Sequence, residues 1–182
     1  MAMLLQLKRF YLLILFNFDR QFYINMIYEF EPLTKEEKDV LLKAPALIAV
    51  LIAGADDVID QHELKRAIEL VNIRTFSEKQ DLHPYYQEVE KTIQQDIADI
   101  IAALAYTAAE RNPIISDELA KVNKLLLRIK AKFARDLYAS WISYAHLIAQ
   151  SWGGVMGINA VGLHEKQWVD LPMINKPAAT AE

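Results

Sequence analysis

The chain has 182 residues, of which 53% are hydrophobic, so it is long enough and apolar enough to form a folded domain with a substantial core. Its formal net charge of −4 offers no concentrated basic surface, which argues against a nucleic-acid partner. The absence of cysteine excludes disulfides, thiolate zinc sites, iron–sulfur clusters and cysteine nucleophiles.

Residues 1–30 differ in pattern from the rest of the chain. A basic pair precedes the apolar run at 10–16, and polar and charged residues then interrupt it. The run is too short for a stable membrane span, which needs about 20 apolar residues, and no small-residue cleavage site of a signal peptide follows it. A membrane-surface anchor, a degenerate signal peptide and translation upstream of the natural start all remain open. Because Met26 leads directly into the first strong helical pattern, we favour upstream translation and treat 1–30 as an appendage to a helical domain over 31–174.

The first predicted helix begins with a capping box. Thr34 and Glu37 form the pattern T-x-x-E, in which each side chain satisfies a free backbone N–H at the helix start. We expect this helix to reach about Ala44 and to kink or restart at Pro45, because proline lacks an N–H and clashes with the preceding turn. The stretch 46–55 is apolar almost throughout, which predicts a helix that is buried on nearly all sides.

The second helix is predicted to begin at a similar cap, formed by Asp60 and Glu63. Apolar residues then follow at helical spacing, at Leu64, Ala67, Ile68 and Val71. Ser77 with Gln80 predicts the start of a third helix, which we expect to break near Pro84 because of the missing N–H.

A longer helix is predicted after Pro84, with an apolar side made of Tyr86, Val89, Ile93, Ile97, Ile100, Ile101 and Leu104. We expect Asn112-Pro113 to end this helix, because the residue before a proline is pushed out of the helical region. Ser116 is then the expected cap of the next helix. A further helix is indicated by an apolar stripe at Phe133, Leu137, Trp141, Tyr144 and Ile148.

The C-terminal part is predicted to contain one last short helix around 165–169, followed by a disordered tail at 175–182. No stretch of the chain shows the alternating pattern of a strand. The sequence therefore predicts an all-α fold, a compact bundle of about seven helices.

The segment 47–64 carries a distinctive pattern. An apolar, alanine-rich helix is followed by Ala55-Asp56-Asp57 and then by a capping aspartate three residues before a glutamate. This pattern resembles the signature turn of the TerB-like family, the helical domain associated with tellurite resistance, with Asp57 where glycine is usual. A fainter second copy is present at 112–119. The resemblance implies an all-α fold, a cytoplasmic setting linked to stress or metal-oxyanion resistance, an acidic surface for divalent metal ions, and no catalytic activity.

Four carboxylates lie close together at Asp56, Asp57, Asp60 and Glu63, and we refer to them as the acidic turn. Hard divalent cations prefer several oxygen ligands on a turn, so these residues are the candidate ligands for weakly bound Ca²⁺ or Mg²⁺. The spacing does not match an EF-hand, since an apolar residue stands where a bidentate glutamate would be required. Asp60 and Glu63 are equally well explained as helix caps, so a functional role would rest on Asp56 and Asp57.

Other candidate chemistry is sparse. The four histidines, at 62, 83, 146 and 164, occupy no recognised metal-ligand spacing, and the chain contains neither E-x-x-H nor G-x-S-x-G. We therefore expect a non-enzymatic module whose acidic turn binds a divalent ion or docks a basic protein partner. Two alternatives remain open. One is a small helical enzyme in which His62, His146 and two carboxylates share a pocket, and the other is a carrier of an apolar ligand between helices.

Overall fold

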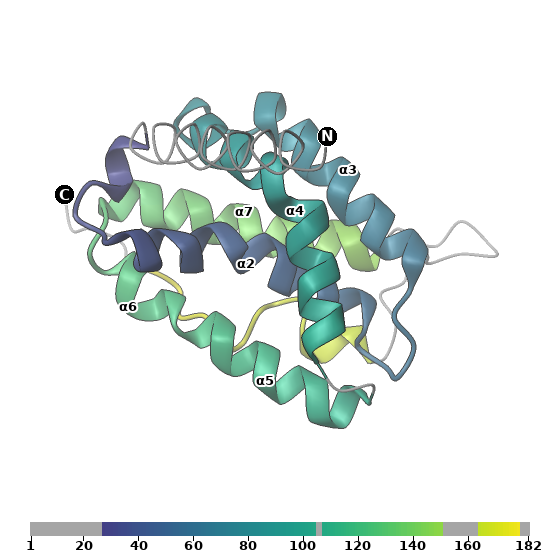
Figure 1. Cartoon of the computed structure of the whole chain (residues 1–182). Coiled ribbons are helices and arrows are strands. Elements are labelled where there is room, and N and C mark those ends of the chain that lie inside the picture. The colour runs from purple at the N-terminus through teal and green to yellow at the C-terminus, as the bar shows by residue number, and fades with distance from the viewer. Residues whose placement is uncertain (1–26, 105–106, 151–163, 179–182) are drawn as a thin grey trace, which may run out of the picture.

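A computed structural model describes residues 27–104, 107–150 and 164–178, and no strand is found among these residues (Figure 1). The α-helices are α2 (Lys35–Ala53), α3 (Gln61–Ser77), α4 (His83–Ala103), α5 (Ala108–Ala120), α6 (Val122–Leu126) and α7 (Ala131–Ala149). Short 3₁₀ turns are η1 (Tyr28–Phe30), η2 (Gln80–Leu82) and η3 (Glu165–Gln167). The predicted all-α class is confirmed.

Two parts of the predicted organisation lie outside the described residues: residues 1–26 of the N-terminal appendage and residues 179–182 of the tail. Nearer the bundle, Asn175 of the predicted tail donates its backbone N–H to Oδ1 of Asn123 at 2.8 Å. In the part of the chain that the structure describes, no helix combines the length and the apolarity needed to cross a membrane.

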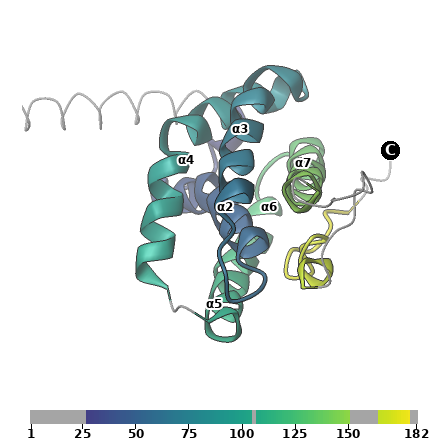
Figure 2. The same cartoon turned by 90° about the vertical axis from the view of Figure 1, so that its right-hand side faces the viewer.

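Helix α2 is the central element of the bundle. It contacts α3, α4, α5, α6 and α7, and Figure 2 shows it between α4 on one side and α7 on the other. Every residue from Ala46 to Ala55 is buried except Leu47, which is partly exposed, so the prediction for this stretch is confirmed. The capping box is also confirmed, since Thr34 N donates to Glu37 Oε2 at 2.8 Å and Glu37 N donates to Thr34 Oγ1 at 3.3 Å.

Of the kink or restart predicted at Pro45, the restart is wrong, because helix α2 continues through this residue. Proline lacks the N–H that would bond the carbonyl of Leu41, one turn earlier. The hydroxyl of Tyr85 on α4 donates to that carbonyl at 2.9 Å, and it accepts a hydrogen bond from Trp141 Nε1 at 3.0 Å. A buried side chain from another helix therefore satisfies the acceptor that the proline leaves open.

The break predicted near Pro84 is confirmed, because η2 ends at Leu82 and α4 begins at His83, with Pro84 in its first turn, where its missing N–H has no helical partner to lose. The cap predicted at Ser77 is wrong, since this residue ends α3. The helix end predicted at Asn112-Pro113 is also wrong. Helix α5 runs through Asn112-Pro113 and includes Ser116 in its interior. Arg111 and Asn112 are buried and bonded to the loop between α2 and α3, and these contacts outweigh the local preference of the residue before a proline.

Helix α7 completes the core. It packs on α2 and α3, and its predicted apolar stripe is confirmed because the buried side chains include Phe133, Leu137, Trp141, Tyr144 and Ile148. The short helix expected around 165–169 is found as the 3₁₀ turn η3, which Trp168 follows. This turn and the start of α5 lie on either side of the site described next.

Candidate binding site at the acidic turn

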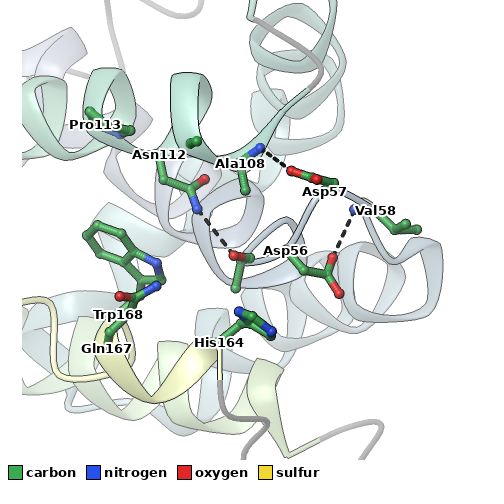
Figure 3. Close-up of a pocket in the computed structure, with 11 residues that line it drawn as sticks. Asp56, Asp57, Val58, Ala108, Asn112, Pro113, His164, Gln167 and Trp168 are labelled. Carbon is green, nitrogen blue, oxygen red and sulfur yellow. Dashed lines mark hydrogen bonds between the residues drawn. The ribbon is translucent and has the colours of Figure 1, made fainter.

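The loop of residues 54–60 joins α2 to α3 and carries Asp56 and Asp57. Asp56 Oδ1 accepts a hydrogen bond from Val58 N at 2.9 Å, and Asp57 Oδ1 accepts one from Ala108 N, at the start of α5, at 2.8 Å (Figure 3). Both carboxylates therefore have structural partners, so a role in the fold is not confined to Asp60 and Glu63 as the sequence suggested. Both residues remain exposed, so their negative charges still face solvent.

A buried arginine attaches this loop to α5. Arg111 is 1% exposed, and its Nη2 donates to the carbonyl oxygens of Gly54 at 2.5 Å and Asp56 at 2.8 Å. Asn112 Nδ2 donates to the carbonyl of Ala55, between them, at 3.4 Å. A Cβ on Gly54 would lie 2.7 Å from Arg111 Nη2, so the close approach of the guanidinium requires glycine at this position. Three consecutive carbonyl groups of the loop are thus bonded to side chains of one helix.

Asp60 and Glu63 have different roles at the start of α3. Asp60 is the N-cap, and its Oδ1 accepts from His62 N at 2.7 Å and from Glu63 N at 3.2 Å, as predicted. The backbone N–H of Asp60 donates to the carbonyl of Ala53 at 2.7 Å and not to the side chain of Glu63. The predicted capping role of Glu63 is therefore wrong, and its side chain is buried, with the residue only 3% exposed.

Glu63 has an unusual electrostatic environment. Its pKa is raised to about 8, first by burial and then by the negative charges of Glu165, Asp60 and Asp56. No cation and no hydrogen-bond donor of the described residues contributes to this shift. The raised pKa of Glu63 therefore reflects burial and neighbouring negative charges, with no compensating cation among its causes.

We expect the stability of the chain to fall as the pH rises toward 8. The pKa of Glu63 is about 8 in the folded chain, against an ordinary value of 4.5, so the folded state binds this proton more tightly than the unfolded state. The resulting stabilisation is complete below pH 4.5 and is lost as the pH rises through about 8. In Glu63→Gln, the free energy of unfolding from urea denaturation should fall less than in wild type between about pH 5 and about pH 9, by on the order of 2 kcal/mol. An equal dependence of the free energy of unfolding on pH in wild type and in Glu63→Gln would contradict this prediction.

A pocket of about 650 Å³ adjoins the acidic turn, and we call it the turn pocket. Its walls come from the loop, the start of α5 and the segment around η3, and they include Asp56, Asp57, Asn112, His164 and Trp168 (Figure 3). Two atoms of these walls, Asn112 Oδ1 and Trp168 Nε1, are buried without a hydrogen-bond partner. Buried polar groups of proteins are nearly always paired, so these two atoms are exceptional.

The predicted metal ligands do not form a ready-made cage. Among the described residues, no three histidine or carboxylate side chains lie together in a group that could hold a metal ion. Metal-binding loops also use backbone carbonyl oxygens, and here those of Gly54 and Asp56 accept hydrogen bonds from Arg111. Binding of Ca²⁺ or Mg²⁺ by the acidic turn stays a prediction, to be tested on the exposed side of Asp56 and Asp57.

The histidines do not show the arrangement that the enzyme alternative requires at this pocket. His164 lines the turn pocket, whereas His62 and His146 do not. His62 is exposed in the first turn of α3, and His146 Nε2 lies 2.9 Å from Oδ1 of Asp170. One histidine, His164, therefore lines the same pocket as the two exposed aspartates.

Sequence reasoning did not identify Arg111, Asn112 or Trp168 as parts of the site. Arg111 and Asn112 follow an alanine-rich segment and precede a proline, but their burial, which makes their bonds to the loop necessary, results from the packing of α5 against α2. Trp168 is separated from the acidic turn by more than a hundred residues, and no pattern in the sequence brings it there.

Comparisons of the chain with protein-family models, curated proteins and solved structures found no match. The resemblance to the TerB-like family therefore rests on the pattern of residues 47–64.

Proposed function

We propose that the chain is a non-enzymatic helical module of the TerB-like type that docks a cationic group of a protein partner on the acidic turn. One observation carries the proposal: the loop that holds Asp56 and Asp57 is bonded to α5, while both carboxylates remain exposed at the turn pocket. A preorganised site loses less conformational entropy on binding than a flexible one. We also propose that the fold is the TerB-like bundle of about seven helices, and that the protein acts in the cytoplasmic, stress-related setting that the resemblance implies.

The electrostatics of Glu63 support a cationic partner. Asp56 and Asp60 both raise the pKa of this buried carboxyl, which means that the charges of the acidic turn repel one another. A positive group that docks beside Asp56 would reduce this repulsion and lower the pKa of Glu63. Below about pH 8, where Glu63 is mostly protonated and neutral, the attraction comes from Asp56 and Asp57, and the charge of Glu63 adds to it only at higher pH.

Weak binding of Ca²⁺ or Mg²⁺ is the second candidate. The exposed carboxylates of Asp56 and Asp57 attract cations, and these two ions prefer oxygen ligands. Arg111 already bonds two of the loop carbonyls, which leaves fewer oxygens for an ion that needs six or more. A single ammonium or guanidinium group needs only one or two carboxylates, so we favour the protein partner.

Replacing Asp56 and Asp57 together by asparagine is expected to weaken binding of the blocked peptide acetyl-Lys-Lys-Lys-amide by about ten-fold. Asparagine keeps an oxygen acceptor for the N–H groups of Val58 and Ala108, so the loop retains its bonds while it loses two negative charges. Isothermal titration calorimetry at about 0.15 M NaCl measures the affinity, and CaCl₂ and MgCl₂ are titrated in parallel.

The matched control is Asp99→Asn with Asp117→Asn, which removes two exposed carboxylates from α4 and α5 and changes the net charge equally. We expect less than about a two-fold change in this variant, since unspecific attraction to distant surface charges is weak in salt. Equal weakening in both double variants would contradict a site at the acidic turn. No binding of the peptide to wild type would refute the proposal, and heat with the salts alone would support the second candidate in its place.

A further inference from the structure

The turn pocket contains a buried acceptor and a buried donor that have no partner. Asn112 is 3% exposed, its Nδ2 bonds the loop, and its Oδ1 accepts nothing. Trp168 Nε1 can only donate, and it donates to no described group. Leaving such a group buried and unpaired is unfavourable, so a ligand atom that displaced the groups covering either of these atoms would be stabilised there.

The two atoms differ in the partner that they need and come from separate elements. Asn112 lies on α5 and Trp168 follows η3, and Figure 3 shows Asn112 between Trp168 and the loop of the acidic turn. Asn112 Oδ1 needs a donor, whereas Trp168 Nε1 needs an acceptor. A metal ion or a simple ammonium ion offers nothing to an indole N–H, and an anion offers nothing to an amide oxygen. An amide group carries both kinds of partner, an N–H and a C=O, as does a water molecule, and the test below distinguishes the two.

The other residues that line the pocket indicate which further groups the ligand carries beside this amide. Asp56 and Asp57 contribute exposed negative charge, and the neighbouring Val58 is 72% exposed and apolar. A chain that bears both positive charges and amides, with methylene groups between them, matches all three features. The volume of about 650 Å³ is within the range of roughly 300–1,000 Å³ that is usual for ligand sites.

We infer that the turn pocket receives a basic peptide segment, with a lysine or arginine side chain at Asp56 and Asp57 and a peptide unit at Asn112 and Trp168. The inference rests on the proposed function and adds to it the class of partner, a peptide and not a free polyamine or metal ion. Charge provides the attraction, and the amide provides the selection, since hydrogen bonds to otherwise unpaired buried groups discriminate strongly between ligands.

The test compares acetyl-Lys-Lys-Lys-amide with spermidine, which carries the same positive charge but no amide. Titration calorimetry of wild type should show at least about ten-fold tighter binding of the peptide. In Trp168→Phe, which keeps an aromatic ring and removes the N–H, peptide affinity should fall by about five-fold or more, while spermidine affinity stays within about two-fold. The indole N–H resonance of Trp168, assigned by its loss in this variant, should shift in ¹H–¹⁵N spectra of wild type with the peptide and not with spermidine.

The outcomes separate this inference from the proposed function. If both ligands bind equally well and the indole resonance does not shift, the inference is overturned while docking of a cation stands. If the peptide is preferred but Trp168→Phe leaves its affinity unchanged and the resonance stays in place, the inference is also overturned, and a bound water molecule then satisfies the indole. If neither ligand binds, both proposals fail. The resonance shift keeps the test decisive even where the variant loses stability.

Discussion

Replacing Arg111 by methionine is expected to lower the free energy of unfolding by about 3–5 kcal/mol. The guanidinium is 1% exposed and is the donor to the carbonyl groups of Gly54 and Asp56. Methionine fills much of the same volume, so the loss would come from two carbonyls left without this donor and from the freed loop. Urea denaturation followed by circular dichroism measures the change.

The control for this variant is Arg66→Met. Arg66 lies on the surface of α3 and forms an ion pair with Glu69 at 3.5 Å, three residues further on. Exposed pairs of this kind contribute little, so we expect a change within about 0.5 kcal/mol. A loss below about 1 kcal/mol in Arg111→Met, or similar losses in both variants, would show that the bonds from Arg111 to the loop contribute little to stability.

Replacing Tyr85 by phenylalanine is expected to lower the free energy of unfolding by about 3 kcal/mol. The ring keeps its packing in the core, and only the hydroxyl is removed. The carbonyl of Leu41 then has no donor, because Pro45 cannot supply one, and Trp141 Nε1 loses its acceptor. Both unpaired groups are buried, which is why one oxygen atom has so large an effect. Tyr28→Phe, at a residue that is 64% exposed, is the matched control and should change stability by less than about 0.5 kcal/mol.

A double-mutant cycle tests whether Pro45 is the reason why loss of the Tyr85 hydroxyl destabilises the fold. In the Pro45→Ala background, residue 45 regains an N–H that bonds the carbonyl of Leu41, so Tyr85→Phe should be about 1 kcal/mol less destabilising than in wild type. Thermal and urea unfolding of the four proteins provide the cycle. Additive effects, within about 0.5 kcal/mol, would show that the hydroxyl of Tyr85 does not substitute for the missing N–H.

The predicted features that are confirmed depend on residues close together in the sequence. The capping box of Thr34 and Glu37 spans one helical turn, and the stripe on α7 repeats at the helical period. The uninterrupted apolar stretch at 46–55 predicts burial whichever neighbours provide it, because such a surface is unfavourable in water. These features required no knowledge of the fold.

Two of the predictions that are wrong concern prolines, where local and tertiary preferences oppose each other. Sequence rules end a helix before Pro113 and kink or restart one at Pro45, yet both residues lie inside continuous helices. At Pro45 the compensating donor comes from Tyr85, and at Pro113 the preceding Arg111 and Asn112 are fixed by the loop at 54–56. Each compensating group lies forty or more residues away along the chain.

For the acidic turn, the sequence by itself determined the composition of the turn, the capping role of Asp60 and the all-helical framework. Only the tertiary structure decided that Asp57 caps α5, that Glu63 is buried with a raised pKa, and that Asn112 and Trp168 complete the turn pocket. The physical reason is the separation along the chain of the residues that form each feature. Caps and helical stripes form between residues within a few positions of one another, whereas a buried charge or an unpaired polar atom exists only after distant helices have packed and excluded water.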